Sequence, residues 1–167
     1  MPRRLLDRCS PDSIREFCAA ARQRFSDGIA LAAAGRRTGA IYLWGYSAEM
    51  ILKAAYFSLS GIAETQRISW PGDLRPAIDR GRAVFHIAWP SAGAGHNVRA
   101  WAELLIAERA ATSAYPRHFA LEVQAHGQRI GSYWNETLRY RKNFAYLYEV
   151  RMMREAAEWL LVNSSRL

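Results

Sequence analysis

The sequence predicts an all-α protein, an up-and-down bundle of five to six helices. Alanine, the strongest helix former, is abundant along the whole chain. Apolar residues recur at helical spacing over several long segments, and no long segment alternates polar and apolar residues as a half-buried strand does. β-Branched residues are sparse, which also argues against a sheet.

The first helix is expected to begin at Ser10-Pro11-Asp12 and to end at Gly35. Ser10 would be the N-cap, and Pro11 suits the first helical position because its missing N–H costs nothing there. The second helix, Thr38–Leu59, is apolar nearly all round and ends at Ser60-Gly61. A helix without a polar face belongs in the middle of a bundle.

Residues 61–95 differ in composition, since they are rich in proline and glycine. They are expected to form a long connection that holds one short helix, near Leu74–Phe85. Three further helices are predicted: His96–Ala111, one that starts near Pro116, and Lys142–Val162. The inward faces of the last two comprise Phe119, Val123, His126, Ile130 and Trp134, and Tyr146, Val150, Met153, Ala157 and Leu160.

The length of 167 residues predicts one domain over the whole chain, with residues 1–10 as an N-terminal extension. No apolar run is long enough to cross a bilayer, and no apolar stretch behind the first residues marks a signal peptide. These features predict a cytoplasmic protein without membrane contact. Cys9 and Cys18 are too few for a disulfide scaffold.

The formal net charge is +8, and every cationic side chain except Lys53 and Lys142 is arginine. Arginine binds phosphate through two parallel hydrogen bonds and stacks on bases, so this surplus suits a nucleic-acid partner. A genome of high GC content would produce the same surplus without any such partner, and the arginines are scattered rather than clustered in a tail.

One face of the second helix carries polar and aromatic side chains, namely Tyr42, Tyr46, Glu49 and Lys53, spaced four, three and four apart. A carboxylate on such an apolar helix needs a cation, and Lys53 is one turn away from Glu49. The pair is either a structural lock that sets the register of the bundle or the wall of a pocket. No metal and no cofactor is predicted, because the four histidines lack the paired spacing of a metal site and His126 is expected to be a satisfied core or boundary histidine.

Three segments resemble the HEPN family (higher eukaryotes and prokaryotes nucleotide-binding), in its stand-alone bacterial branch. The string Gly45-Tyr46-x-x-Glu49-x-x-Leu52-Lys53-Ala54 is similar to the family's second helix. Gly95-His96-Asn97-Val98 resembles the start of its next long helix, and Trp134-x-x-x-x-Arg139-Tyr140-Arg141 a segment before its last one.

The resemblance implies a helical bundle, often a homodimer, with links to RNA or nucleotides and to toxin–antitoxin or defence systems. We therefore expect a non-catalytic binding protein that pairs as a homodimer, with RNA, a nucleotide or a protein encoded nearby as partner. The expected ligand-binding residues are Tyr46, Glu49, Lys53, His96, Arg139, Tyr140 and Arg141. Arg139 would pair with Glu49 if the bundle closes as in the family.

Two alternatives remain. Many HEPN domains are metal-independent ribonucleases that use an arginine and a later histidine with four to six residues between them. Here only Arg80 and His86 have that spacing, and they lie in the mid-chain connection, where the family does not place its motif. The second alternative is a structural partner subunit of a toxin–antitoxin-like complex, with no ligand of its own.

Overall fold

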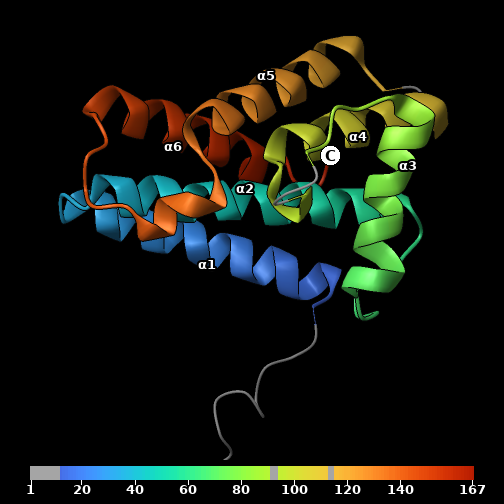
Figure 1. The fold of residues 1–167 in the computed structure, drawn as a ribbon, viewed down its shortest axis with the longest axis horizontal. Coiled ribbons are helices and arrows are strands. Elements are labelled where there is room, and N and C mark those ends of the chain that lie inside the picture. Colours follow the sequence, from blue (N-terminus) through green and yellow to red (C-terminus); the bar gives the residue numbers. More distant parts are fainter. Residues whose placement is uncertain (1–11, 91–93, 113–114) are drawn as a thin grey trace, which may run out of the picture.

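The computed structural model describes residues 12–90, 94–112 and 115–167, and these ranges hold six α-helices and no strand (Figure 1). The all-α prediction is confirmed. The α-helices are α1 (Ile14–Ala33), α2 (Arg37–Leu59), α3 (Arg75–Phe85), α4 (Val98–Thr112), α5 (Arg117–Tyr133) and α6 (Leu147–Val162). Shorter helical turns lie between them: η2 (Trp70–Leu74), η3 (Ala94–His96) and η4 (Glu136–Tyr140).

Helix α2 is the centre of the molecule, as its apolar composition predicts. It packs against α1 on one side and against α4 and α6 on others (Figure 1). A Cβ at Gly28 of α1 would lie 2.5 Å from the Trp44 indole nitrogen, so this glycine lets the two helices approach closely. Trp44 Nε1 donates to the carbonyl of Phe25 at 3.1 Å, and Ser47 Oγ donates to that of Ala21 at 2.8 Å. Both buried polar groups are thereby satisfied across the α1–α2 interface.

Helix α1 begins at Ile14, later than predicted, with Ser13 as its N-cap in place of Ser10. Ser13 Oγ accepts from the backbone N–H of Glu16 at 3.2 Å. The Asp12 carbonyl accepts from Ile68 N at 2.7 Å. This hydrogen bond joins the residue before the N-cap of α1 to the long connection between α2 and α4. Ser10 and Pro11 lie outside the described residues. The predicted helix end is confirmed, because Gly35 adopts a left-handed φ of 72° just after the last turn.

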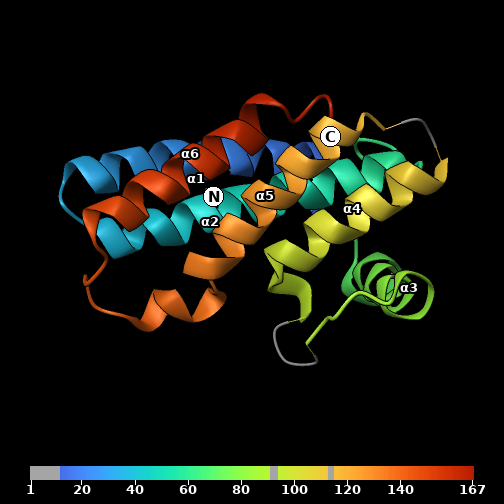
Figure 2. The same ribbon diagram turned by 90° about the horizontal axis from the view of Figure 1, so that it is seen from above.

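The long connection between α2 and α4 contains α3, which stands across one end of the bundle (Figures 1 and 2). The predicted short helix is present, one residue shorter at its start, and the π-type turn η2 precedes it. Helix α4 begins at Val98 instead of His96, because residues 94–96 form the separate turn η3.

Helix α6 begins at Leu147, five residues later than predicted. Asn143 holds the preceding segment against the α1–α2 turn: its side chain donates to Gly35 O at 2.9 Å and accepts from Thr38 N at 3.1 Å. Thr38 Oγ1 accepts from the backbone N–H groups of Phe144 (2.9 Å) and Ala145 (3.1 Å). These groups are therefore used outside the helix. Tyr146 is the exposed N-cap, not a member of the buried stripe.

No helix in the described ranges combines the length and the apolar character that a bilayer crossing requires.

Candidate functional site

Glu49 is a carboxylate in the interior of α2 and is only 3% exposed. Lys53 Nζ donates to its Oε1 at 2.5 Å, so the predicted pair within the helix is present. The second partner comes from a distant part of the chain: His96 Nδ1 lies 3.1 Å from Glu49 Oε2. One buried carboxylate therefore holds together two basic side chains. This arrangement satisfies charges that would be costly if they were buried alone.

The turn η3 fixes the place of His96. The indole nitrogen of Trp101 donates to Gly95 O at 3.1 Å, and the side chain of Asn97 accepts from Ala100 N, which closes the first turn of α4. The His96 side chain remains 39% exposed. Its hydrogen bond to Glu49 raises the pKa of His96, against an opposing effect of burial, so the protonated form persists to higher pH. When His96 is protonated, the cluster Glu49–Lys53–His96 carries one net positive charge.

Tyr46 forms an aromatic wall beside this cluster. Its ring meets those of Tyr42 (5.0 Å between centroids), Trp134 (5.3 Å) and His96 (5.8 Å) edge to face. Trp134 Nε1 donates to the Tyr42 carbonyl at 2.9 Å, and a Cβ on Gly45 would collide with the Trp134 ring. Burial raises the pKa of Tyr46 far above its usual value, so its hydroxyl stays protonated at neutral pH.

A pocket of about 300 Å³ opens at this cluster. Its lining includes Tyr46, Glu49, Lys53 and His96 together with Trp70 of η2, which is 51% exposed. A Cβ at Gly95 would stand 2.9 Å from the Trp70 ring, so the indole packs closely on the η3 turn. The remaining lining residues are Asp12, Phe17, Met50, Leu74 and Gly95. The pocket thus combines a buried ion cluster with an exposed aromatic face.

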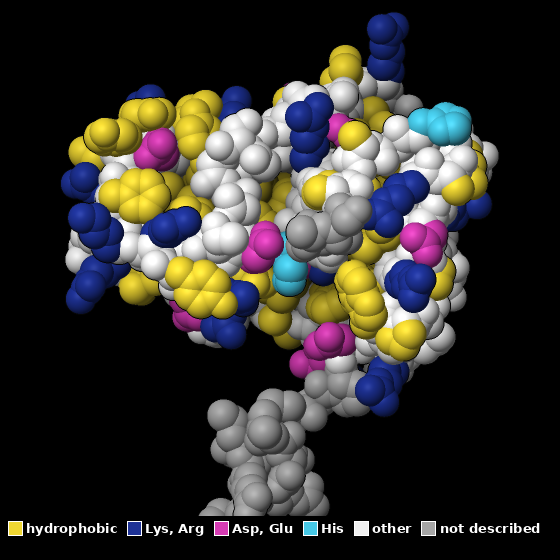
Figure 3. Space-filling view, viewed as in Figure 1, with side chains coloured by type: hydrophobic (Ala, Val, Ile, Leu, Met, Phe, Trp, Pro, Cys, Tyr) yellow, Lys and Arg dark blue, Asp and Glu magenta, His cyan; other side chains and the backbone are white. Residues whose placement is uncertain are grey.

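A second hollow of about 280 Å³ shares His96 and is lined on its other side by Arg99, Trp134, Asn135 and Glu136. His96 therefore lies between two recesses of the same face. The face of the molecule that Figure 3 shows carries hydrophobic side chains interspersed with cationic and a few acidic ones.

Arg139, Tyr140 and Arg141 are all exposed at the end of η4. The guanidinium of Arg139 lies 4.7 Å from the centre of the Tyr140 ring. Its charge also acts on the Tyr46 hydroxyl, where it opposes part of the burial-driven rise in pKa. The expected pair between Arg139 and Glu49 is wrong: the Glu49 oxygens are buried and taken by Lys53 and His96.

Arg80 and His86 do not form a site together. The Arg80 guanidinium makes a two-point ion pair with Glu108, with Nη2 at 3.2 Å from Oε2 and Nε on Oε1. His86 is the exposed C-cap of α3 and has a left-handed φ of 54°. Within the described part of the chain no hydrogen bond joins the two side chains, so their spacing does not produce a joint active site here.

Trp70 is the site residue that the sequence analysis missed. It stands next to Pro71 and Gly72, outside any predicted helix face, and a large aromatic side chain in such a loop-like segment is the signal that could have found it. Trp134 was assigned only to a helix face and a family motif, although its ring supports Tyr46.

His126, predicted to be a satisfied core or boundary histidine, is half-buried and only partly satisfied. Its ring stacks on Trp159 at 4.5 Å, but its buried Nδ1 has no hydrogen-bond partner among the described residues. The expectation of a satisfied histidine is therefore wrong for this atom. Within the ranges described, no cluster of three or more His, Cys, Asp or Glu side chains could hold a metal ion.

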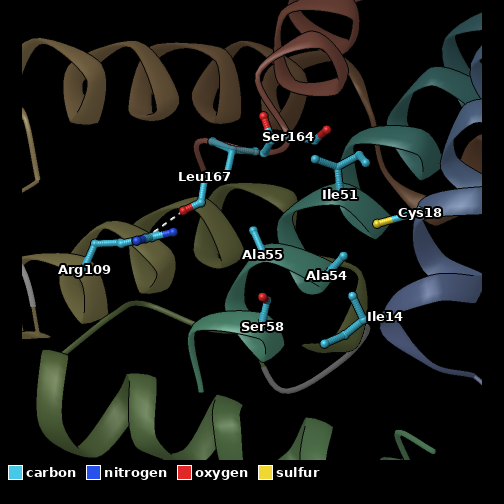
Figure 4. Close-up of a pocket in the computed structure, with 10 residues that line it drawn as sticks. Ile14, Cys18, Ile51, Ala54, Ala55, Ser58, Arg109, Ser164 and Leu167 are labelled. Atoms are coloured by element: carbon cyan, nitrogen blue, oxygen red, sulfur yellow. Dashed lines mark hydrogen bonds between the residues drawn. The ribbon is translucent and has the colours of Figure 1, made fainter. Parts of the chain in front are cut away.

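A separate pocket lies at the other side of α2 and is lined mainly by small and apolar residues (Figure 4). Arg109 Nε donates to the carbonyl oxygen of Leu167 at 2.7 Å on its wall. Burial raises the pKa of the Cys18 thiol there, so the sulfur stays protonated and is a poor nucleophile. The lining of this pocket holds fewer charged side chains than the lining of the site at His96.

Comparison with family models, curated proteins and solved structures yields no match to this chain.

Proposed function

We propose that this protein is a HEPN-like helical binding module whose pocket at His96 takes a nucleotide or a short stretch of RNA. The observation that carries the proposal is the cluster Glu49–Lys53–His96 at the base of a pocket with an exposed indole, Trp70. The resemblance supports it, since two segments that resemble the family, around Glu49 and around His96, meet in this cluster although they are 47 positions apart.

The chemistry of the pocket suits a ligand with a phosphate and a base. His96 is half exposed and its pKa is raised by the hydrogen bond to Glu49, so a phosphate oxygen would meet a cationic N–H donor. Arg139 is exposed beside Tyr46 and supplies a second cation that could bind the phosphate backbone of an RNA ligand. Trp70 offers a flat face on which a base can stack, a contact worth about 1–3 kcal/mol per base.

Binding without catalysis is the function that these contacts favour. Nδ1 of His96 is engaged by Glu49, and Arg80, the arginine of the only predicted ribonuclease pair, is engaged by Glu108. The alternative of a metal-independent ribonuclease predicts RNA cleavage in EDTA that Arg80→Ala or His86→Ala abolishes. We expect both variants to behave as the wild type in that assay.

The test is binding of a fluorescein-labelled single-stranded RNA by anisotropy, and of ADP by calorimetry. His96→Ala should weaken binding by about tenfold or more, since a charge-assisted hydrogen bond contributes about 1.5–3 kcal/mol. His118→Ala is the matched control, because it removes an exposed histidine from the start of α5. The affinity for RNA should fall as salt rises, and also as pH rises through the raised pKa of His96. Two results would contradict the proposal: the wild type binds neither the RNA nor ADP, or His96→Ala and His118→Ala bind with equal affinity.

A further inference from the structure

An apolar groove of about 350 Å³ lies between the end of α1 and the beginning of α6, away from His96. Figure 2 shows these two helix ends side by side. The groove is lined by Ile29, Ala32 and Ala33 of α1, Trp44 of α2, and Leu147, Val150, Arg151 and Arg154 of α6. Its floor is therefore apolar, and its cations all come from one helix.

The frame of this groove is rigid. Asn143 and Thr38 tie the approach to α6 onto the α1–α2 turn through hydrogen bonds of 2.9–3.1 Å. Trp44 is fully buried, and its ring is held against Gly28. A groove with a fixed shape binds a partner at lower entropic cost than one that must form on contact.

Two of the lining side chains are apolar and exposed: Leu147 is 68% exposed and Ile29 39%. Nothing in the described part of the chain covers Leu147, the first residue of α6. Large apolar side chains that border a concave apolar surface are typical of docking sites for an amphipathic helix.

The charges at the groove restrict the partner. Arg151 forms no ion pair with any residue in the described ranges, and Arg154 meets only Glu158, at 3.8 Å and in solvent, where such pairs contribute little. A second copy of this chain that docked through the same face would bring these arginines against each other, which opposes self-association. RNA would match the charge but not the floor, since bases stack on exposed flat rings and the one aromatic ring in the lining, Trp44, is buried.

We propose that this groove binds an acidic amphipathic helix of a partner protein. Leucine- or phenylalanine-type anchors at helical spacing would fill the floor beside Leu147 and Ile29. Aspartate or glutamate residues next to them would pair with Arg151 and Arg154. The proposal is independent of the His96 pocket, so His96→Ala leaves this interaction unchanged.

The test is selection from a displayed library of random 16-residue peptides against the wild-type protein, followed by affinity measurements on synthetic peptides. The selected peptides should be acidic, with apolar residues at spacings of three and four. Leu147→Asp and Arg151→Glu should each weaken their binding at least about tenfold. Leu121→Asp and Arg117→Glu, which change exposed residues of α5 in the same way, should not. Circular dichroism melting of all four variants shows whether each is folded.

Several outcomes would overturn the proposal: no enrichment of any peptide, enrichment of peptides without acidic residues, or equal binding to folded Leu147→Asp and to the wild type. A wild-type dimer that Leu147→Asp dissociates would assign the groove to a second copy instead. Loss of RNA binding in Leu147→Asp, with no peptide selected, would assign it to RNA.

Discussion

Replacement of Glu49 by alanine tests whether the buried ion cluster stabilises the fold. Glu49 is 3% exposed and Lys53 is 6% exposed, and among the described residues the Glu49 carboxylate is the only ion-pair partner of both Lys53 and His96. Glu49→Ala leaves the Lys53 ammonium in the interior, where its remaining favourable contact is with the Trp101 ring at 5.6 Å. Water can reach His96, which is half exposed, so most of the loss should come from Lys53.

Breaking a buried ion pair by removal of one partner costs about 3–5 kcal/mol. For a domain of this length, each kcal/mol corresponds to a change of about 2–4 °C in melting temperature, so Glu49→Ala should melt about 6–20 °C below the wild type. Replacing both partners, in Glu49→Leu/Lys53→Met, should restore at least half of that loss, because no charge is then left unpaired.

The assay is urea and thermal unfolding, both followed by circular dichroism, for the wild type, Glu49→Ala and Glu49→Leu/Lys53→Met. Glu103→Ala is the matched control, since it removes the carboxylate of an exposed pair of the same spacing, Arg99–Glu103 at 3.0 Å. It should cost no more than about 0.5 kcal/mol. A loss below about 1 kcal/mol for Glu49→Ala would refute the reasoning and show that water or rearrangement satisfies Lys53.

Three further predictions concern packing, pH and assembly. Gly45→Ala should lose about 1–3 kcal/mol of unfolding free energy by urea titration, because its Cβ meets the Trp134 ring; a gain in stability would contradict this close contact. Burial lowers the pKa of His126 below its usual 6.5, so its contribution to stability is present above that pH and is lost as pH falls through the folded pKa. Relative to its stability at pH 8, His126→Phe should therefore lose less unfolding free energy in acid than the wild type. If the unfolding free energies of the two proteins change in parallel with pH, His126 does not cause the acid sensitivity. The homodimer remains a prediction, and light scattering at tens of micromolar that reports a monomer would count against it.

The features of this protein that depend on local spacing were predictable from the order of its residues. Helical periodicity predicted most of the α-helices, because burial of one face at a period of 3.6 residues is visible in the order of residues, although α1, α4 and α6 begin later than predicted. The same logic found the Glu49–Lys53 pair, since residues four apart on a helix face each other. The end of α1 at Gly35 also followed from local chemistry, because glycine readily adopts a positive φ.

Contacts between residues that are distant in the chain were not predictable in this way, because they depend on how the helices pack. His96 reaches Glu49 across 47 positions, and nothing in its local sequence distinguishes it from Arg139, the partner that was expected. The start of α6 lies at Leu147 because hydrogen bonds between Thr38 and the segment 143–145, more than 100 positions away, hold the chain before α6 on the α1–α2 turn, and Tyr146 is extended. Spacing along the chain specifies contacts within one helix. Contacts between helices depend on how their buried faces pack, and that packing is a property of the whole chain.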